Sequence, residues 1–478
     1  MNNVLRIKNG VMWSAIDKIA YSAGQLCLNL IIARLILPEE YALVAMITIF
    51  IAIGQTFIDS GFGQAIIQKQ DRSELDLSTV FYFNIVVAII IYCIIFVLSP
   101  LIADFYDNNI FIPLTRIVAL NLIISSLSIV QRSILTIKVD FRTQAYISII
   151  SLIISGMISI WMAYSGYGVW AMVAQILIVH GISCLLLWII VGWRPILKFS
   201  MKSFNILFSY GSKLLASRLL NTICQNIYTL AIGKVYAPVQ VAFFNNANQL
   251  SMYSACYLNE IIGRTLFPIM CEMQTDKDKL LSFFYKTVRL SSYIIFPIMM
   301  GMIVLAKPFI LTILSDKWIG MMKYMQIIAF AYMWYPLMGS NQLFTIIGRT
   351  DLYLKCEVIR KIVFAFTISS TLFLNVDFIC LGIVVYNITE ILIAVQMLKQ
   401  IINISLKKLF INILPSLLFS MCMTMVIVVS TFSLPSEFLK LTVGVMIGIV
   451  SYYLLGVIFR SSSLSDIKKI LKSKQIKE

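Results

Sequence analysis

Charged residues and histidine are scarce in this chain. Only 13% of its 478 residues are Asp, Glu, Lys or Arg, and His180 is the single histidine. The nine cysteines are scattered, mostly within apolar stretches, and no Cys-x-x-Cys spacing occurs. These absences argue against a zinc site and a disulfide scaffold. We interpret the cysteines as small buried apolar side chains and His180 as a packing residue. We therefore expect neither a metal nor a cofactor.

Apolar residues make up 60% of the chain, and the mean hydropathy is +0.91. A soluble protein of this size could not bury so much apolar surface. The sequence therefore predicts an all-α polytopic membrane protein in contact with membrane lipid. The net charge of +16 is spread between apolar runs instead of being clustered on one domain, so we expect no nucleic-acid partner.

Apolar runs of about 20 residues, long enough to cross a bilayer as helices, recur about fourteen times. No segment between them resembles a soluble domain, and we expect no cleavable signal peptide. The expected spans are Gly10–Leu37, Tyr41–Ile67, Val80–Ile102, Pro113–Thr136, Ala145–Tyr164, Gly168–Val191, Tyr210–Val235, Ala242–Ile269, Val288–Ile310, Tyr324–Ile347, Glu357–Leu374, Phe378–Leu398, Leu409–Phe432 and Phe438–Phe459.

The loops between these spans carry an asymmetric positive charge. If the N-terminus is inside, roughly 23 Lys and Arg residues lie on the cytoplasmic side and roughly 6 on the other. We expect both termini in the cytoplasm and the protein in a bacterial cytoplasmic (inner) membrane. The basic tail, residues 461–478, is expected to lie on anionic lipid.

A stripe of polar residues runs along one helical face of the first span, and a second stripe follows after a gapless offset of 200 residues. The same offset aligns Pro38 with Pro238 and Ala42 with Ala242, and it also aligns the glycines at 63 and 263. We name these two sets the first and second polar stripe. The first comprises Lys18, Tyr21, Ser22, Gln25 and Asn29, and the second comprises Arg218, Asn221, Thr222, Gln225 and Thr229.

The offset predicts two structurally related halves. Because six spans, an even number, separate the two stripes, both halves enter the membrane in the same direction. Their pseudo-two-fold axis then runs along the membrane normal. We expect a six-helix lobe at residues 1–200 and a second at 201–405. Two appended helices follow at 406–460.

The chain contains five distinctive motifs, at Ala33–Tyr41, Phe57–Gln68, Gly166–Val173, Leu266–Pro268 and Ser315–Trp318. These motifs resemble bacterial polysaccharide-export flippases of the Wzx type, in the multidrug, oligosaccharidyl-lipid and polysaccharide exporter superfamily. The resemblance implies a V-shaped pair of six-helix lobes around a central cavity. It also implies flipping of an undecaprenyl-diphosphate-linked oligosaccharide by alternating access, for capsule, O-antigen or another surface polysaccharide.

Such a cargo is anionic and cannot cross hydrocarbon unaided. Lys18 and Arg218 are our candidates for its phosphates, each about eight residues into its span, or roughly 12 Å at about 1.5 Å per residue. The alternative is that they pair with Asp17, Asp59 or Glu260 as structural countercharges. A charged side chain inside the membrane costs free energy, so those that are present commonly have a function.

Other polar residues at membrane depth have two interpretations each. Gln25, Gln225, Asn29 and Thr229 either bind sugar hydroxyls or join helices by hydrogen bonds. Asp59 and Glu260 either take up H⁺ or Na⁺ as a coupling ion or neutralise an arginine. Further cations lie at Arg116, Arg132, Arg264 and Arg289, of which we carry Arg116 and Arg264 as substrate-binding candidates.

Two alternatives to a flippase follow from the same sequence. A small-molecule or drug antiporter of this superfamily would favour a cavity lined by acidic residues, whereas the charged residues of the two stripes are basic. A membrane-embedded polysaccharide polymerase or ligase needs a catalytic surface, but the outer loops around Asp104–Ile112 and Ser315–Lys323 are short and lack one. We therefore expect a transporter and not an enzyme. A monomer suffices, with other polysaccharide assembly proteins as possible associates.

Overall fold

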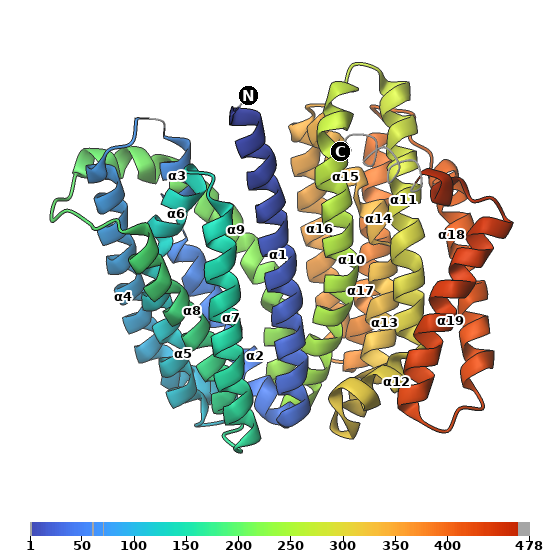
Figure 1. Ribbon diagram of the computed structural model, residues 1–478, viewed down its shortest axis with the longest axis horizontal. Coiled ribbons are helices and arrows are strands. Elements are labelled where there is room, and N and C mark those ends of the chain that lie inside the picture. The colour runs from blue at the N-terminus through green and yellow to red at the C-terminus, as the bar shows by residue number, and fades with distance from the viewer. Residues whose placement is uncertain (1, 60–61, 70, 467–478) are drawn as a thin grey trace. The chain divides into compact units, whose positions relative to one another are not determined.

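The computed structural model describes residues 2–59, 62–69 and 71–466, and every regular element within these ranges is a helix (Figure 1). Some side chains inside the helices lie outside the description, including those of Glu260 and Arg264. The chain divides into two compact units, Met1–Ala242 and Phe243–Glu478.

Unit 1 contains the first nine helices. They are α1 (Asn2–Leu35), α2 (Pro38–Ile58), α3 (Phe62–Gln68), α4 (Glu74–Phe105), α5 (Phe111–Ser126), α6 (Ile129–Ile137), α7 (Phe141–Tyr164), α8 (Val169–Val191) and α9 (Met201–Val235). Two of them, α3 and α6, are short and follow a break in an expected span.

Unit 2 holds the later helices, beginning within α10. They are α10 (Pro238–Glu272), α11 (Lys277–Val304), α12 (Ala306–Phe309), α13 (Met322–Met333), α14 (Tyr335–Met338), α15 (Ser340–Ile346), α16 (Thr350–Thr371), α17 (Val376–Leu398), α18 (Leu406–Thr431) and α19 (Glu437–Ile458). A π-helical turn at Ile310–Leu314 and a 3-10 helix at Asp316–Met321 join α12 to α13.

Nine helical segments among the described residues are long and apolar enough to cross a membrane. They correspond to α2, α4, α5 with α6, α7, α8, α11, α17, α18 and α19. The remaining expected spans overlap α1, α9, α10, α13 to α15, and α16. The protein is thus an all-helical, multi-pass membrane protein, and a total of fourteen crossings stays a prediction.

The ends of α1 and α9 follow the 200-residue offset. Each helix ends three residues before a proline, and the next helix begins at that proline, Pro38 or Pro238. Proline suits the first helical position because its missing N–H has no partner there. Both helices begin earlier than the apolar runs predict, at Asn2 and Met201, because a helix needs no apolar side chains in its first turns.

Several expected spans are interrupted, including the fourth between α5 and α6 and the ninth between α11 and α12. The second is divided into α2 and α3, whereas its repeat partner α10 is continuous. The tenth is divided into α13, α14 and α15, and Pro336 lies at the start of α14. A proline inside a helix removes one backbone hydrogen bond and clashes with the preceding turn, which favours the break between α13 and α14.

Helix α1 packs against α7 (Figure 1). A reciprocal pair of glycines and leucines lies at this contact. Leu152 of α7 covers Gly24, where an added Cβ would lie 2.5 Å from Leu152 Cδ2. Leu28 of α1 covers Gly156, where an added Cβ would lie 2.6 Å from Leu28 Cδ2. Small residues let membrane helices approach closely, so these glycines set the rotation of α1.

We expect Gly156→Val to lower the free energy of unfolding by about 1–3 kcal/mol, because overpacking pushes α1 away from α7. Thermal unfolding in detergent measures the change. Gly181→Val is the matched control, since a Cβ at Gly181 meets no atom within 4 Å. Equal stability of the two variants would show that the close approach is unimportant.

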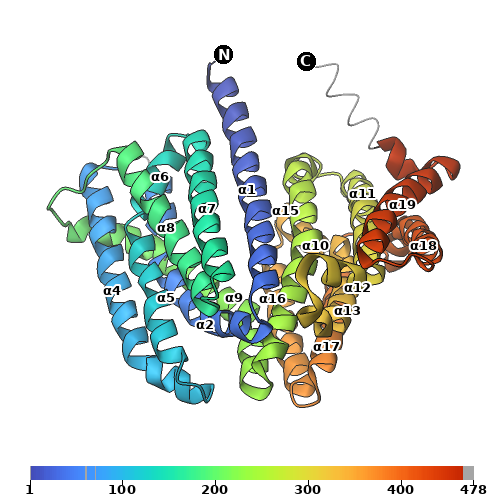
Figure 2. The same cartoon turned by 60° about the horizontal axis from the view of Figure 1, so that its bottom comes forward.

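In unit 2, α18 packs against both α11 and α19 (Figure 2). The Tyr452 hydroxyl of α19 donates to the Tyr293 carbonyl oxygen of α11 at 2.8 Å. Phe419 and Tyr452 belong to the same apolar cluster as Tyr293. The last two helices are therefore packed onto unit 2 through buried aromatic residues.

Candidate functional site

The first polar stripe lies on α1, away from the face that packs on α7. At about 100° per residue, Gly24 and Leu28 are centred roughly a quarter turn from the stripe. Lys18 is exposed, and the other stripe residues are half-buried. Gln25 Nε2 donates to Asn29 Oδ1 at 3.1 Å, so these two amides are held one turn apart on the same face.

The second polar stripe lies on α9, which packs against α2, α3 and α4 within unit 1. Its residues divide into two groups. Thr229 is buried, and the hydroxyls of Thr222 and Thr56 are 3.0 Å apart, which joins α9 to α2. Asn221 and Gln225 are exposed. The contacts of Thr222 therefore fit a packing role, and the exposed edge of the stripe is its available part.

Lys18 and Arg218 hold matching places in their helices. Lys18 lies sixteen residues after the start of α1, and Arg218 lies seventeen after the start of α9, so both are farther along than the apolar runs suggested. Arg218 is half-buried and lies within electrostatic range of Asp59. The countercharge interpretation of Arg218 thus has its expected partner nearby.

Asp59 caps the C-terminus of α2 and is exposed. Gln55 Nε2 donates to Asp59 Oδ1 at 3.2 Å, which orients the carboxylate. Asp17 lies on the side of α1 that faces α7, beside Ser148, and its Oδ1 is buried without a hydrogen-bond partner among the described atoms. The two acids therefore occupy different surroundings, one open and one between helices.

Arg132 of α6 acts electrostatically on both of these acids. Its Nη2 donates to Ser183 Oγ of α8 at 2.8 Å, which fixes the guanidinium. The sequence analysis named Arg132 but did not carry it as a site residue. The available signal was the polar triplet Gln131-Arg132-Ser133 inside an apolar run. We add Arg132 to the polar cluster of unit 1, which we define as Asp17, Asp59, Arg132 and Arg218.

Arg116 is engaged within unit 1 by neighbouring α4. Its Nε donates to Ser99 Oγ at 2.9 Å, and its guanidinium carbon lies 4.0 Å from the centre of the Phe96 ring. These contacts fit a packing role. The candidates Glu260 and Arg264 belong to α10, but their side chains lie outside the described part of the structure. Their predicted roles are therefore untested.

Unit 2 contains an ion cluster that the sequence analysis missed. Arg360 of α16 is only 5% exposed and pairs with Glu357 of the same helix and with Glu390 of α17. Asn341 Nδ2 of α15 also donates to Glu390 Oε1, at 3.0 Å. We call these four residues the Arg360 cluster. Charged residues inside two expected apolar spans were the signal that could have found it.

Across the described ranges, no three His, Cys, Asp or Glu residues come together in a group that could hold a metal ion. His180 of α8 is half-buried and lies within electrostatic range of Arg132. The chemistry available to these sites is therefore that of fixed cations, carboxylates, amides and hydroxyls.

Comparisons with known proteins place these features in context. The sequence profile of a family described as polysaccharide biosynthesis protein matches residues 31–323. Teichuronic acid biosynthesis protein TuaB of Bacillus subtilis (strain 168) is 24% identical over 351 residues, which cover 73% of this chain and 72% of TuaB. Lipopolysaccharide biosynthesis protein WzxC of Escherichia coli (strain K12) is 24% identical over 326 residues, 67% of this chain and 65% of WzxC.

Among solved structures, the lipid II flippase MurJ in an inward closed conformation is similar with a TM-score of 0.72. The sequences are 16% identical, and the alignment covers 94% of this chain and 98% of MurJ. At this level of identity the likeness concerns the fold.

Proposed function

Because this chain belongs to the family of polysaccharide biosynthesis proteins, we propose that it is a flippase for a polyprenyl-diphosphate-linked oligosaccharide repeat unit. It would carry this unit across the cytoplasmic membrane by alternating access, for surface polysaccharide biosynthesis. Both termini would be cytoplasmic, and the protein would act as a transporter without catalysing a reaction. The fold shared with MurJ supports a lipid-linked cargo.

The observation that carries this proposal is the pair of polar stripes on α1 and α9. Each begins with a cation and continues with amides or hydroxyls in a protein that is otherwise strongly apolar. A diphosphate bearing sugars loses its hydration in the membrane, and fixed cations and hydrogen-bonding groups can replace that hydration. Lys18 and Arg218 would bind the phosphates, with Arg264 and Arg116 as further candidates.

The sugars would meet the amides and hydroxyls of the stripes. Gln25, Asn29 and the exposed Gln225 would offer donors and acceptors to sugar hydroxyls, with Thr229 as the buried end of the second stripe. The stripes belong to lobes that we propose at residues 1–200 and 201–405, although α9 packs within unit 1. The same lobes would rock about the cargo during transport.

Asp17, Asp59 and Glu260 are proposed as countercharges or as sites for a coupling ion, H⁺ or Na⁺. Asp59 suits this role within the described residues, because it is exposed and lies within range of Arg132 and Arg218. Protonation of Asp59 would leave these two arginines more strongly attractive to a phosphate.

Reconstitution tests the proposal. Proteoliposomes would carry a fluorescent undecaprenyl-diphosphate oligosaccharide, and a membrane-impermeant lectin would report its appearance on the opposite leaflet. We expect lectin binding to increase faster than in protein-free liposomes. Equal rates in the two preparations, with folded protein present, would contradict the flippase. Uptake of a cationic dye without movement of the oligosaccharide would favour a drug antiporter instead.

A further inference from the structure

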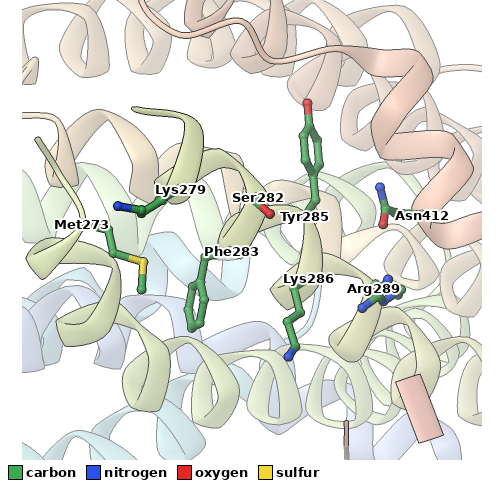
Figure 3. A pocket seen from close by; sticks show the side chains of 8 residues that line it. All are labelled: Met273, Lys279, Ser282, Phe283, Tyr285, Lys286, Arg289 and Asn412. Carbon is green, nitrogen blue, oxygen red and sulfur yellow. The ribbon is translucent and has the colours of Figure 1, made fainter. Parts of the chain in front are cut away.

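A cavity of about 480 Å³ in unit 2 is lined chiefly by α11, together with Asn412 of α18 (Figure 3). A cavity of this volume accommodates a small polar group together with part of an attached chain. Neither polar stripe contributes to it, since its lining residues all lie between 273 and 412. The cavity is therefore lined by a different set of residues from the two polar stripes.

One face of α11 gives the cavity its charge. Lys279, Ser282, Lys286 and Arg289 follow one another at intervals of three or four residues, so they share one helical face. Lys279 pairs with Asp276 at 2.9 Å in an exposed position, where such a pair contributes little. Lys286 and Arg289 are the cations that lie deeper, with 49% and 27% of their side chains exposed.

A carboxylate of the same chain already bridges these two cations. Asp466 Oδ1 lies 3.1 Å from Lys286 Nζ, and Asp466 Oδ2 lies 3.1 Å from Arg289 Nη2. The Asp466 side chain is 13% exposed. Two oxygens of one anionic group, each on its own cation, reproduce the way in which a phosphate is held between basic side chains. The single charge of Asp466 does not neutralise both cations.

The surroundings of the cavity favour a lipid over a free phosphate. Asn412 lines the cavity, and its Nδ2 donates to the Lys408 carbonyl oxygen at 2.8 Å. Phe410 and Ile411, which precede it on α18, are exposed apolar side chains. Met273 and Phe283 add apolar lining. A headgroup in the cavity would thus have apolar surface nearby for its acyl chains.

We infer that this cavity binds the phosphate of an anionic lipid headgroup, which replaces the Asp466 carboxylate as the partner of Lys286 and Arg289. Asp466 competes with the lipid for Lys286 and Arg289, so lipid binding displaces the Asp466 carboxylate from these two cations of α11. The inference does not depend on the proposed transport activity.

Native mass spectrometry of the full-length protein in detergent tests the site with dioleoyl phosphatidylglycerol and dioleoyl phosphatidylcholine. We expect wild type to prefer phosphatidylglycerol. Lys286→Gln/Arg289→Gln should weaken its binding at least tenfold, given about 1 kcal/mol for each cation near an anionic lipid. Lys407→Gln/Lys408→Gln is the matched control, because it removes two neighbouring cations outside the cavity lining and should change binding by less than about threefold.

Asp466→Asn provides a second test that keeps both cations. Removal of the competing charge should tighten phosphatidylglycerol binding about fivefold. Unchanged affinity of the Asp466→Asn variant for phosphatidylglycerol would overturn the inference. This variant decides the question if the double variant fails to fold. Equal losses in the cavity variant and the Lys407/Lys408 control would also overturn it, as would a wild type that binds neither phosphatidylglycerol nor undecaprenyl diphosphate.

A third arm replaces phosphatidylglycerol by undecaprenyl diphosphate. Binding of this carrier alone, with the same dependence on Lys286 and Arg289, supports the phosphate site and identifies the transported lipid as its source. That outcome rests on the proposed function. Binding of phosphatidylglycerol supports the site even if the protein moves no oligosaccharide, so the two proposals fail separately.

Discussion

Replacement of Arg360 by methionine is expected to lower the free energy of unfolding by about 3–5 kcal/mol, because it leaves carboxylates buried without their cation. Glu390 is the residue most affected, since it lies on a different helix and its remaining partner in the cluster is the Asn341 amide. Methionine has a similar length and retains much of the packing. Thermal and chemical unfolding in detergent would measure the loss.

Two further variants isolate the cause. Lys361→Met removes the neighbouring cation, which is half-buried and lies 6.0 Å from the centre of the Phe364 ring, so we expect a change within about 1 kcal/mol. The triple variant Glu357→Gln/Arg360→Met/Glu390→Gln should recover most of the lost stability, because it leaves no buried charge unpaired. A triple variant as unstable as Arg360→Met alone would rule out the charge explanation.

Neutralising Lys18 and Arg218 together is expected to weaken binding of undecaprenyl-diphosphate oligosaccharide more than a hundredfold. Each charged hydrogen bond to a phosphate contributes about 1.5–3 kcal/mol, so two correspond to about 3–6 kcal/mol. The double variant Lys18→Ala/Arg218→Ala would be compared with wild type by ligand binding to purified protein. Lys18 is exposed and Arg218 is half-buried, so the variant should remain folded.

Arg34→Ala/Lys234→Ala is the matched control for this prediction. These cations also obey the 200-residue offset, but sixteen residues separate each from the stripe cation of its helix. On an ideal helix they therefore point about 160° away from it. We expect the control to bind within about threefold of wild type. If the folded Lys18/Arg218 variant binds as well as this control, these two cations are structural countercharges.

A conservative exchange sharpens the distinction. Lys18→Arg/Arg218→Lys retains both charges while changing the shape of each donor group. Binding restored to within about tenfold of wild type would indicate that charge dominates, whereas a full loss would indicate a requirement for the planar guanidinium of Arg218.

The sequence by itself predicted the apolar segments that are long enough to cross a membrane and the 200-residue offset between α1 and α9. Each expected span overlaps one helix or a run of consecutive helices, and α2 and α10 begin at the aligned prolines Pro38 and Pro238. These features are local, because apolar length and a missing N–H act within one stretch of chain. The motif resemblance was equally local, and the matching family profile confirms it.

The tertiary structure decided which polar groups meet. Glu390 and Arg360 are thirty residues apart and come together only because α16 packs on α17. Helix α6 brings Arg132 within electrostatic range of Asp17 and Asp59, and the spacing of these residues in the sequence does not predict this. In an apolar environment a buried charge is stable only beside a partner. The choice of that partner depends on packing between distant segments, whereas entry into the membrane depends on each segment alone.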